Sequence, residues 1–238
     1  MFRLFSLSLC VVGLVVGMAF PMVAQNNKPT QTNNIAKNDP NATAALAAIQ
    51  KKYNALSSLD VAFNLTNEIP SKPATTQKGT FVQMKDNYVL KLDEYELYCN
   101  GKNLWVYDKN KKLVQINDSG GQKKEASPDL LSPRDLLRIY EWKDFSHVIS
   151  NISKDKQGNT TNEIDLIPLK KNSEYFKIKL TASQKNSQIQ RIKVFYKDGV
   201  RQTFDVVTMT PNKKYASSYF EFDTKKNPKV KVEDLRID

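Results

Sequence analysis

Histidine, cysteine and glycine are scarce in this chain of 238 residues, which contains one histidine, two cysteines and 8 glycines. A single histidine excludes a cluster of histidine metal ligands. The two cysteines, Cys10 and Cys99, cannot build a thiolate zinc site or a disulfide framework. Few glycines and 10 prolines exclude collagen-like and low-complexity architectures. Many enzyme chemistries are therefore excluded before any motif is considered.

The overall composition is that of an ordinary soluble globular protein, with 40% hydrophobic and 26% charged residues. Lysine and arginine number 36 against 25 acidic residues, a formal net charge of +11. The excess is mostly lysine and is spread along the chain without an arginine-rich stripe, so we expect no nucleic-acid partner. Two interpretations stay open: a solvated basic surface, or attraction to anionic membranes or acidic proteins.

The first 24 residues have the pattern of a secretory signal peptide. Arg3 precedes an almost uninterrupted apolar run from Leu4 to Ala24, which polar residues then end abruptly. The alternative is an uncleaved membrane anchor. Cys10 lies inside the run, so a lipoprotein-type signal is not predicted. We therefore expect export from the cytoplasm, with residues 25–40 as a disordered linker rich in Asn, Gln, Thr and Lys.

Residues 41–238 are predicted to form a single domain that begins with one amphipathic helix. Asp39-Pro40-Asn41 is a helix start with proline near the first turn. Apolar residues then recur at helical spacing until about Ser57 or Ser58, namely at Leu46, Ile49, Tyr53 and Leu56.

After this helix the apolar period changes to two, which predicts about eleven short antiparallel strands in a single curved sheet. The predicted strands are 59–66, 79–85, 88–93, 95–99, 103–107, 112–116, 147–153, 161–168, 175–182, 189–196 and 202–208, with a further one through Tyr219–Phe222. The fold class is therefore mainly β with a few helices.

One segment interrupts the strands with two helix starts, at Ser127-Pro128 and at Ser132-Pro133. Large apolar residues follow both starts. We expect this segment to be a helical lid over one face of the sheet, formed by Leu130, Leu131, Leu136, Leu137 and Tyr140.

No catalytic motif is present: the chain lacks a nucleophile elbow, a glycine-rich phosphate loop and a metal-ligand spacing. His147 lies in an alternating strand and is expected to be a surface or half-buried residue. The carboxylates of Asp93, Glu94 and Glu96 fit a charged turn between strands. We predict neither an enzyme nor a bound cofactor or metal.

The predicted strands carry more large apolar side chains than two short helical segments need for packing. Alternation places most of them on the concave face of the sheet. One interpretation is an ordinary core; the other is a cavity that binds an acyl chain. The candidate cavity residues are Leu59, Val61, Phe63, Leu65, Phe81, Tyr88, Leu90, Leu92 and Trp105.

Four short motifs resemble the periplasmic lipoprotein carrier family, LolA and its relatives. Gly101-Lys-Asn-Leu-Trp-Val-Tyr107 is similar to the family's Gly-Lys-x-Leu-Trp-x-Tyr hairpin. Leu56–Phe63 and Gly79–Phe81 are similar to its first two strands. Tyr219–Phe222, followed by 228–234, resembles its closing pattern, with Lys229 in place of a glycine.

The resemblance implies an unclosed β-barrel with a helical lid, whose cavity receives lipoprotein acyl chains. It also implies a monomeric chaperone that takes acylated lipoprotein cargo from an inner-membrane ATP-driven transporter to an outer-membrane acceptor. By this resemblance Lys85 stands where the family has an arginine that gates the lid; the alternative is an ordinary exposed lysine at the end of a strand. A membrane-anchored acceptor of the same fold would need a lipid-attachment cysteine, which the chain lacks. A periplasmic lipid-binding or envelope-sensing module that binds acyl chains without transferring them stays open.

Overall fold

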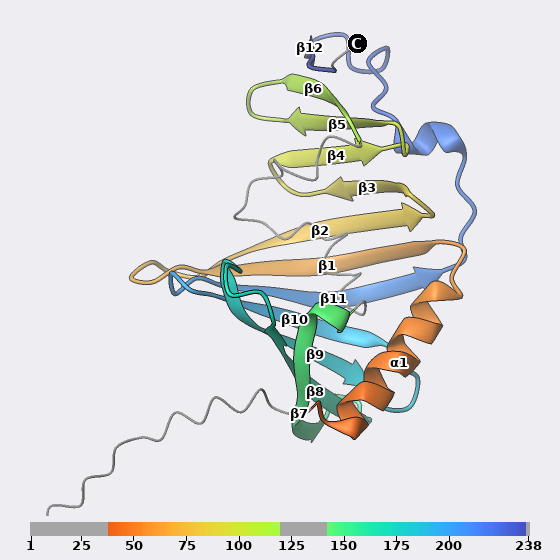
Figure 1. The fold of residues 1–238 in the computed structure, drawn as a ribbon. Helices are drawn as coiled ribbons and strands as arrows, with labels where there is room; N and C mark the ends of the chain where they lie inside the picture. Colours follow the sequence, from red (N-terminus) through yellow and green to blue (C-terminus); the bar gives the residue numbers. More distant parts are fainter. Residues whose placement is uncertain (1–37, 120–141, 237–238) are drawn as a thin grey trace, which may run out of the picture. The chain divides into compact units, whose positions relative to one another are not determined.

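The computed structural model describes residues 38–119 and 142–236, which form one α-helix, a twelve-stranded sheet and two short 3-10 helices (Figure 1). The α-helix is α1 (Pro40–Asn54), and the 3-10 helices are η2 (Trp142–Asp144) and η3 (Ser217–Phe220). The strands are β1 (Leu59–Glu68), β2 (Thr75–Met84), β3 (Asn87–Lys91), β4 (Tyr95–Cys99), β5 (Asn103–Asp108), β6 (Leu113–Asp118), β7 (Phe145–Lys154), β8 (Thr160–Pro168), β9 (Tyr175–Ser183), β10 (Ile189–Tyr196), β11 (Arg201–Pro211) and β12 (Lys231–Asp234).

The strands follow the order β12-β6-β5-β4-β3-β2-β1-β11-β10-β9-β8-β7. Neighbours pair antiparallel, except that β12 runs parallel to β6. The outermost strands β12 and β7 do not pair with each other, so the sheet does not close. The predicted fold class, a mainly β protein with an unclosed sheet, is confirmed. The prediction of about eleven antiparallel strands missed β12 and its parallel pairing.

Alternation along the strands gives the sheet two faces. We call the face on which α1 lies the inner face (Figure 1). The opposite, outer face carries Val82, Val89 and Trp105, which alternate with core residues on the same strands. The C-terminal segment covers this part of the outer face, because Phe220 packs on Val82 and Val89 and Phe222 packs beside Trp105.

The strand predicted through Tyr219–Phe222 is wrong, because Ser217–Phe220 forms the 3-10 helix η3. Phe220 and Phe222 are both buried, which gives the same alternating pattern as a half-buried strand. Their rings pack against the outer face, but the backbone here does not pair with a neighbouring strand. Two aromatic residues spaced by two therefore indicated burial correctly but did not indicate strand pairing.

Helix α1 begins as predicted, with Pro40 in its first turn and Asp39 as the N-cap. Its buried stripe contains Leu46, Ile49 and Tyr53. The helix ends at Asn54, before the predicted Ser57 or Ser58. The reason is that Ser57 and Ser58 bond the start of the segment after β11: the Ser57 N–H donates to Asn212 Oδ1, and Ser58 Oγ donates to the Lys213 carbonyl.

His147 on β7 is buried, with 2% of its surface exposed, so the prediction of a surface or half-buried residue was wrong. The start of α1 folds over it and places Thr43 Oγ1 2.8 Å from His147 Nε2. The ring of Trp142 packs against it edge-on, with centroids 4.8 Å apart. The histidine therefore helps to dock α1 on the sheet.

Asp39 joins the same junction through both carboxylate oxygens, which accept hydrogen bonds from the N–H groups of Ile149 and Asn41. These bonds favour the ionised form and lower the pKa of Asp39. A lowered folded-state pKa contributes stability that is present above the unfolded value of about 3.9 and is lost as the pH falls through the folded value.

Replacing Asp39 with asparagine is expected to flatten the acid side of the stability profile, because asparagine carries no titrating carboxyl group. Urea unfolding of both proteins between about pH 6 and 3 measures this. The wild-type midpoint should fall more steeply below about pH 4.5 than that of Asp39→Asn. Parallel profiles would show that Asp39 does not contribute to acid sensitivity.

No helix within the described residues is long and apolar enough to cross a membrane. The predicted signal peptide, most of the linker and the five predicted lid residues lie outside the described ranges.

Candidate functional site

Eight of the nine residues predicted to line an apolar cavity lie in one buried cluster on the inner face. They come from β1, β2, β3 and the residue after β3, and alternate with outward-facing positions as a strand requires. The cluster contains Leu59, Val61, Phe63, Leu65, Phe81, Tyr88, Leu90 and Leu92.

Trp105 is the exception, and its assignment to this face was wrong. It packs on the outer face with Val114 and Phe222. Its neighbours on β5, Leu104 and Val106, point to the inner face instead. Alternation alone could not decide between the two faces of β5, because Leu104, Trp105 and Val106 are all apolar.

Residues of β4 and β5 extend the inner face beyond the predicted set. Leu97, Cys99, Leu104 and Val106 belong to the same cluster or pack against it. Cys99 is buried, with 2% of its surface exposed. These residues were not predicted because the size of the aromatic residues Trp105 and Tyr107 favours them as the inner-facing ones, although both lie on the outer face of β5.

The strand register aligns these side chains into a continuous apolar row, which we call the inner row. Val61 pairs with Phe81, Phe81 with Leu90, Leu90 with Leu97, and Leu97 with Val106. The inner row thus crosses five neighbouring strands, β1 to β5, without a charged side chain. Such a strip is apolar throughout and offers no group for acid–base or nucleophilic chemistry.

A glycine lies directly beside this row. Gly79 pairs with Phe63 across β1 and β2. A Cβ atom at Gly79 would lie 2.6 Å from Phe63 Cε2 and 2.9 Å from Leu92 Cδ2. The missing side chain therefore provides the space that the Phe63 ring occupies. That ring also packs against Phe204, with centroids 5.5 Å apart.

Helix α1 covers the other half of the inner face, over β7 to β11 (Figure 1). Tyr53 connects it to two of these elements: its Oη accepts the Ile189 N–H and lies 3.5 Å from Met209 Sδ. Helix α1 thus fills the inner face of one half of the sheet, and the inner row belongs to the other half.

Lys85 lies in the turn between β2 and β3, exposed and with a positive φ of 56°. Its carbonyl accepts a hydrogen bond from Gln83 Nε2. The position at the end of β2 is the one expected of the gate residue. Its predicted role depends on residues 130–140, which lie outside the described ranges, and stays a prediction.

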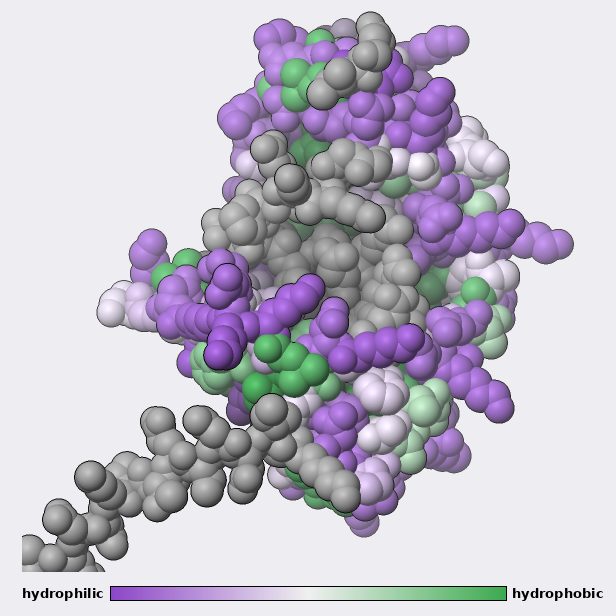
Figure 2. All heavy atoms as spheres, viewed as in Figure 1, coloured by the Kyte–Doolittle hydropathy of each residue, from purple (hydrophilic) through white to green (hydrophobic). Residues whose placement is uncertain are grey.

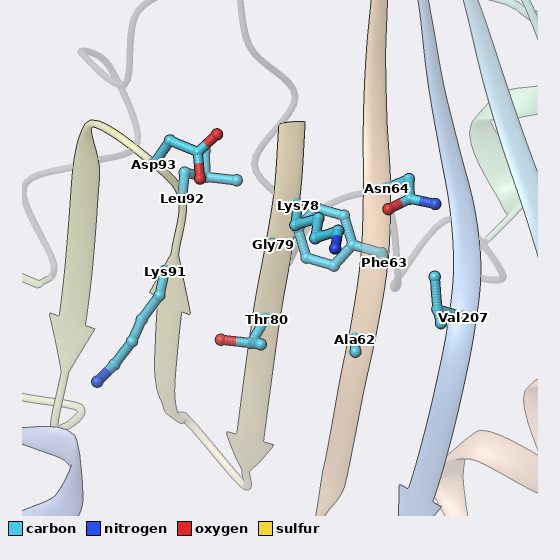
Figure 3. Close-up of a pocket in the computed structure, with 10 residues that line it drawn as sticks. All are labelled: Ala62, Phe63, Asn64, Lys78, Gly79, Thr80, Lys91, Leu92, Asp93 and Val207. Atoms are coloured by element: carbon cyan, nitrogen blue, oxygen red, sulfur yellow. The ribbon is translucent and has the colours of Figure 1, made fainter. Parts of the chain in front are cut away.

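A pocket of about 470 Å³ lies over β1 to β3 and the adjoining part of β11 (Figure 3). Lysine side chains and small residues line it, including Lys78, Lys91, Thr80 and Ala62. These four alternate with Phe63, Gly79 and Leu92 of the core, so their side chains belong to the outer face. Phe63, Gly79 and Leu92 line the pocket as well, so it differs from the inner row in its lysine side chains but includes two of the predicted cavity residues.

The titratable groups near the predicted turn at Asp93 and Glu94 form a structural network. Glu96 accepts a hydrogen bond of 2.6 Å from Tyr98 Oη and pairs with Lys109 Nζ at 3.1 Å. Burial and this carboxylate raise the pKa of the Tyr98 hydroxyl. Lys109 also donates to the Leu92 carbonyl. The network joins β3 to β5, as a charged turn would.

Within the described ranges, no group of three or more His, Cys, Asp or Glu side chains could hold a metal ion. On the face that Figure 2 shows, hydrophilic side chains cover most of the described surface, as the net charge of +11 leads one to expect. The apolar inner row thus contrasts with the hydrophilic side chains that dominate this view.

Solved structures align with this chain at low sequence identity. An uncharacterized conserved protein from Thermus thermophilus aligns with a TM-score of 0.52 and 8% identity, over 82% of this chain and 98% of that one. A DUF1329 family protein from Desulfovibrio piger aligns at 0.45 and 11%, over 76% and 97%. A LolA superfamily protein from Nitrosomonas europaea aligns at 0.42 and 12%, over 76% and 98%. No curated protein matches the sequence.

Residues 56–223 match the family described as outer membrane lipoprotein carrier protein LolA. The match begins just after α1, runs from β1 to β11 and the buried Phe222, and so includes the whole inner row. Because it covers well over half of the sequence, this chain belongs to the LolA family of outer membrane lipoprotein carrier proteins.

Proposed function

We propose that this protein is a periplasmic carrier that binds the acyl chains of lipoproteins on the inner face of β1 to β5. It takes a lipoprotein from an inner-membrane ATP-driven transporter and delivers it to an outer-membrane acceptor. Membership of the LolA family supports this proposal. The family consists of periplasmic carrier or binding proteins, which need no catalytic group.

The inner row is the observation on which the proposal rests. Its five side chains, from Val61 to Val106, cross five strands side by side and carry no charge. Burial of apolar surface contributes about 25 cal/mol per Å², so a hydrocarbon chain that replaces the groups now burying this row is held by the same apolar contacts, without any covalent step. A carrier needs this kind of reversible binding because it must release its cargo.

Two neighbouring residues of β3 allow a matched test of where acyl chains bind. Leu90 faces the inner row and Val89 faces the outer face, with 3% and 2% of their surfaces exposed. Leu90→Asn and Val89→Asn should both destabilise the fold, because each buries a polar amide. Only Leu90→Asn should weaken acyl binding, by about 10–100-fold, since the amide would face the hydrocarbon without a partner.

Titration with a fluorescent fatty acid, under conditions where both variants are folded by circular dichroism, measures this effect. Equal affinities of the two variants would contradict binding at the inner row. A second assay follows labelled triacylated lipoprotein from transporter-containing vesicles to outer-membrane vesicles. A protein that binds fatty acid but does not move lipoprotein would be a lipid-binding or envelope-sensing module and not a carrier.

A further inference from the structure

The two edges of the sheet differ in length and protection. At one end β12 is only four residues long and carries Lys231, Glu233 and Asp234, which discourage pairing with another chain. At the other end β7 is ten residues long and carries exposed apolar side chains. Val148 and Ile152 are 46% and 58% exposed. A long edge of this kind is a template for an additional strand.

The first part of the β7 edge is already occupied by the residues before α1. The Asp39 N–H donates to the His147 carbonyl at 3.1 Å. The N–H groups of His147 and Ile149 donate to Asn38 Oδ1 and Asp39 Oδ2. These contacts show that the backbone groups of His147 and Ile149 point away from β8, and that backbone and carboxylate ligands fit along this edge.

The second part of the edge continues from Ile149 to Lys154. The register with β8 shifts between Ile149 and Asn151, so Ser150 is an additional residue in β7. Beyond this bulge, backbone groups point outward again at Ile152 and Lys154, two residues apart. No residue of the described ranges accepts a hydrogen bond from either N–H group. Both residues are exposed.

We propose that the edge of β7 between Ile149 and Lys154 binds an extended acidic segment of a partner protein, which pairs with it as an additional strand. Ile152 offers a donor and an acceptor to such a strand, and Lys154 offers a second pair. The site is at the β7 edge of the sheet, whereas the inner row crosses β1 to β5. The proposal therefore does not depend on the carrier function.

Charge favours an acidic partner over a second copy of this chain. Lys154 and Lys156 are exposed at the open end of the edge. The nearby Asp155 carboxylate is engaged by Asn159 and Gln190, so it stays turned toward its own loop. Two copies, each with a formal charge of +11, would bring these lysines together. A segment with carboxylates at its ends would instead pair with them.

Amide exchange and chemical shifts of the ¹⁵N-labelled protein test this proposal. The probe is a capped peptide of alternating threonine and valine with a glutamate at each end. It should shift the Ile152 and Lys154 amide signals and slow their exchange. The same peptide with N-methyl groups on the edge-facing amides should not bind. A version with terminal lysines should bind at least about tenfold more weakly, because it repels Lys154 and Lys156.

Ile152→Pro removes the outward N–H while leaving the bonds to β8, a substitution that edge strands tolerate. It should weaken peptide binding at least about tenfold, whereas Ile152→Thr, which keeps the N–H, should bind within about threefold of wild type. Unchanged binding by Ile152→Pro or by the N-methylated peptide would overturn the proposal. So would slow exchange at Ile152 and Lys154 in the free protein, which would mean that its own chain occupies the edge. Self-association lost in Ile152→Pro would assign the edge to a second copy instead.

Discussion

Gly79→Ala is expected to destabilise the protein by about 1–3 kcal/mol, the usual cost of inserting a methyl group into a packed core. The added Cβ would lie 2.6 Å from Cε2 of the Phe63 ring and 2.9 Å from Leu92 Cδ2. Phe63 cannot move freely, because it is buried and packs against Phe204. Urea unfolding measures the loss as a lower midpoint with an unchanged slope.

A second substitution separates this clash from a general effect of alanine in the strand. In Gly79→Ala/Phe63→Leu, the smaller side chain leaves room for the new methyl group, so the double variant should lose at least about 1 kcal/mol less than the sum of the single losses. Thr80→Ala, at an exposed neighbouring position, should stay within about 0.5 kcal/mol of wild type. Additive losses would show that Phe63 does not need the space at Gly79.

Gly79→Ala is also expected to affect the proposed acyl site. Phe63 lies in the inner cluster beside the inner row, so a ring displaced by the added methyl group would move toward that row. We therefore expect weaker fatty-acid binding in Gly79→Ala and partial recovery in the double variant.

Most of the sheet could be predicted from the sequence because its strands have one buried face. In β1, Leu59, Val61, Phe63 and Leu65 alternate with more exposed residues, and a period of two fixes which face each side chain occupies. In the structure, eight of the residues assigned in this way lie in one buried cluster on the inner face. The inner cluster could thus be predicted without knowing which strands pair.

The errors arose where both faces of a strand are covered. On β5, Leu104 packs inside and Trp105 packs outside, so both parities are apolar and alternation cannot assign a face. His147 was misjudged for a related reason: the polar ring is buried because a segment far earlier in the chain, at Thr43, folds over it. Contacts of that range leave no local pattern.

The C-terminal segment covers the outer face of these strands, and Phe220 is its main anchor. Its side chain is 0% exposed and packs on Val82 and Val89 of the outer face. Tyr215 and Tyr219 contact its ring edge-on, at centroid distances of 6.1 and 5.5 Å. The segment lies there because the outer face of β2 and β3 carries apolar side chains that would otherwise meet water.

Phe220→Ala is therefore expected to cost about 3–5 kcal/mol, the range for removing a fully buried aromatic side chain. Tyr219→Ala is the matched control, since its neighbouring ring is 39% exposed and should cost clearly less. Urea unfolding gives both values, and proteolysis after Lys213 or Lys214 should be faster in Phe220→Ala because the segment loses its anchor. At temperatures where Phe220→Ala is folded, fatty-acid affinity should be unchanged, because Phe220 and the inner row lie on opposite faces. Equal losses in the two variants would mean that η3 rests on the sheet without being held by Phe220, and a loss of acyl binding would mean that the two faces are coupled.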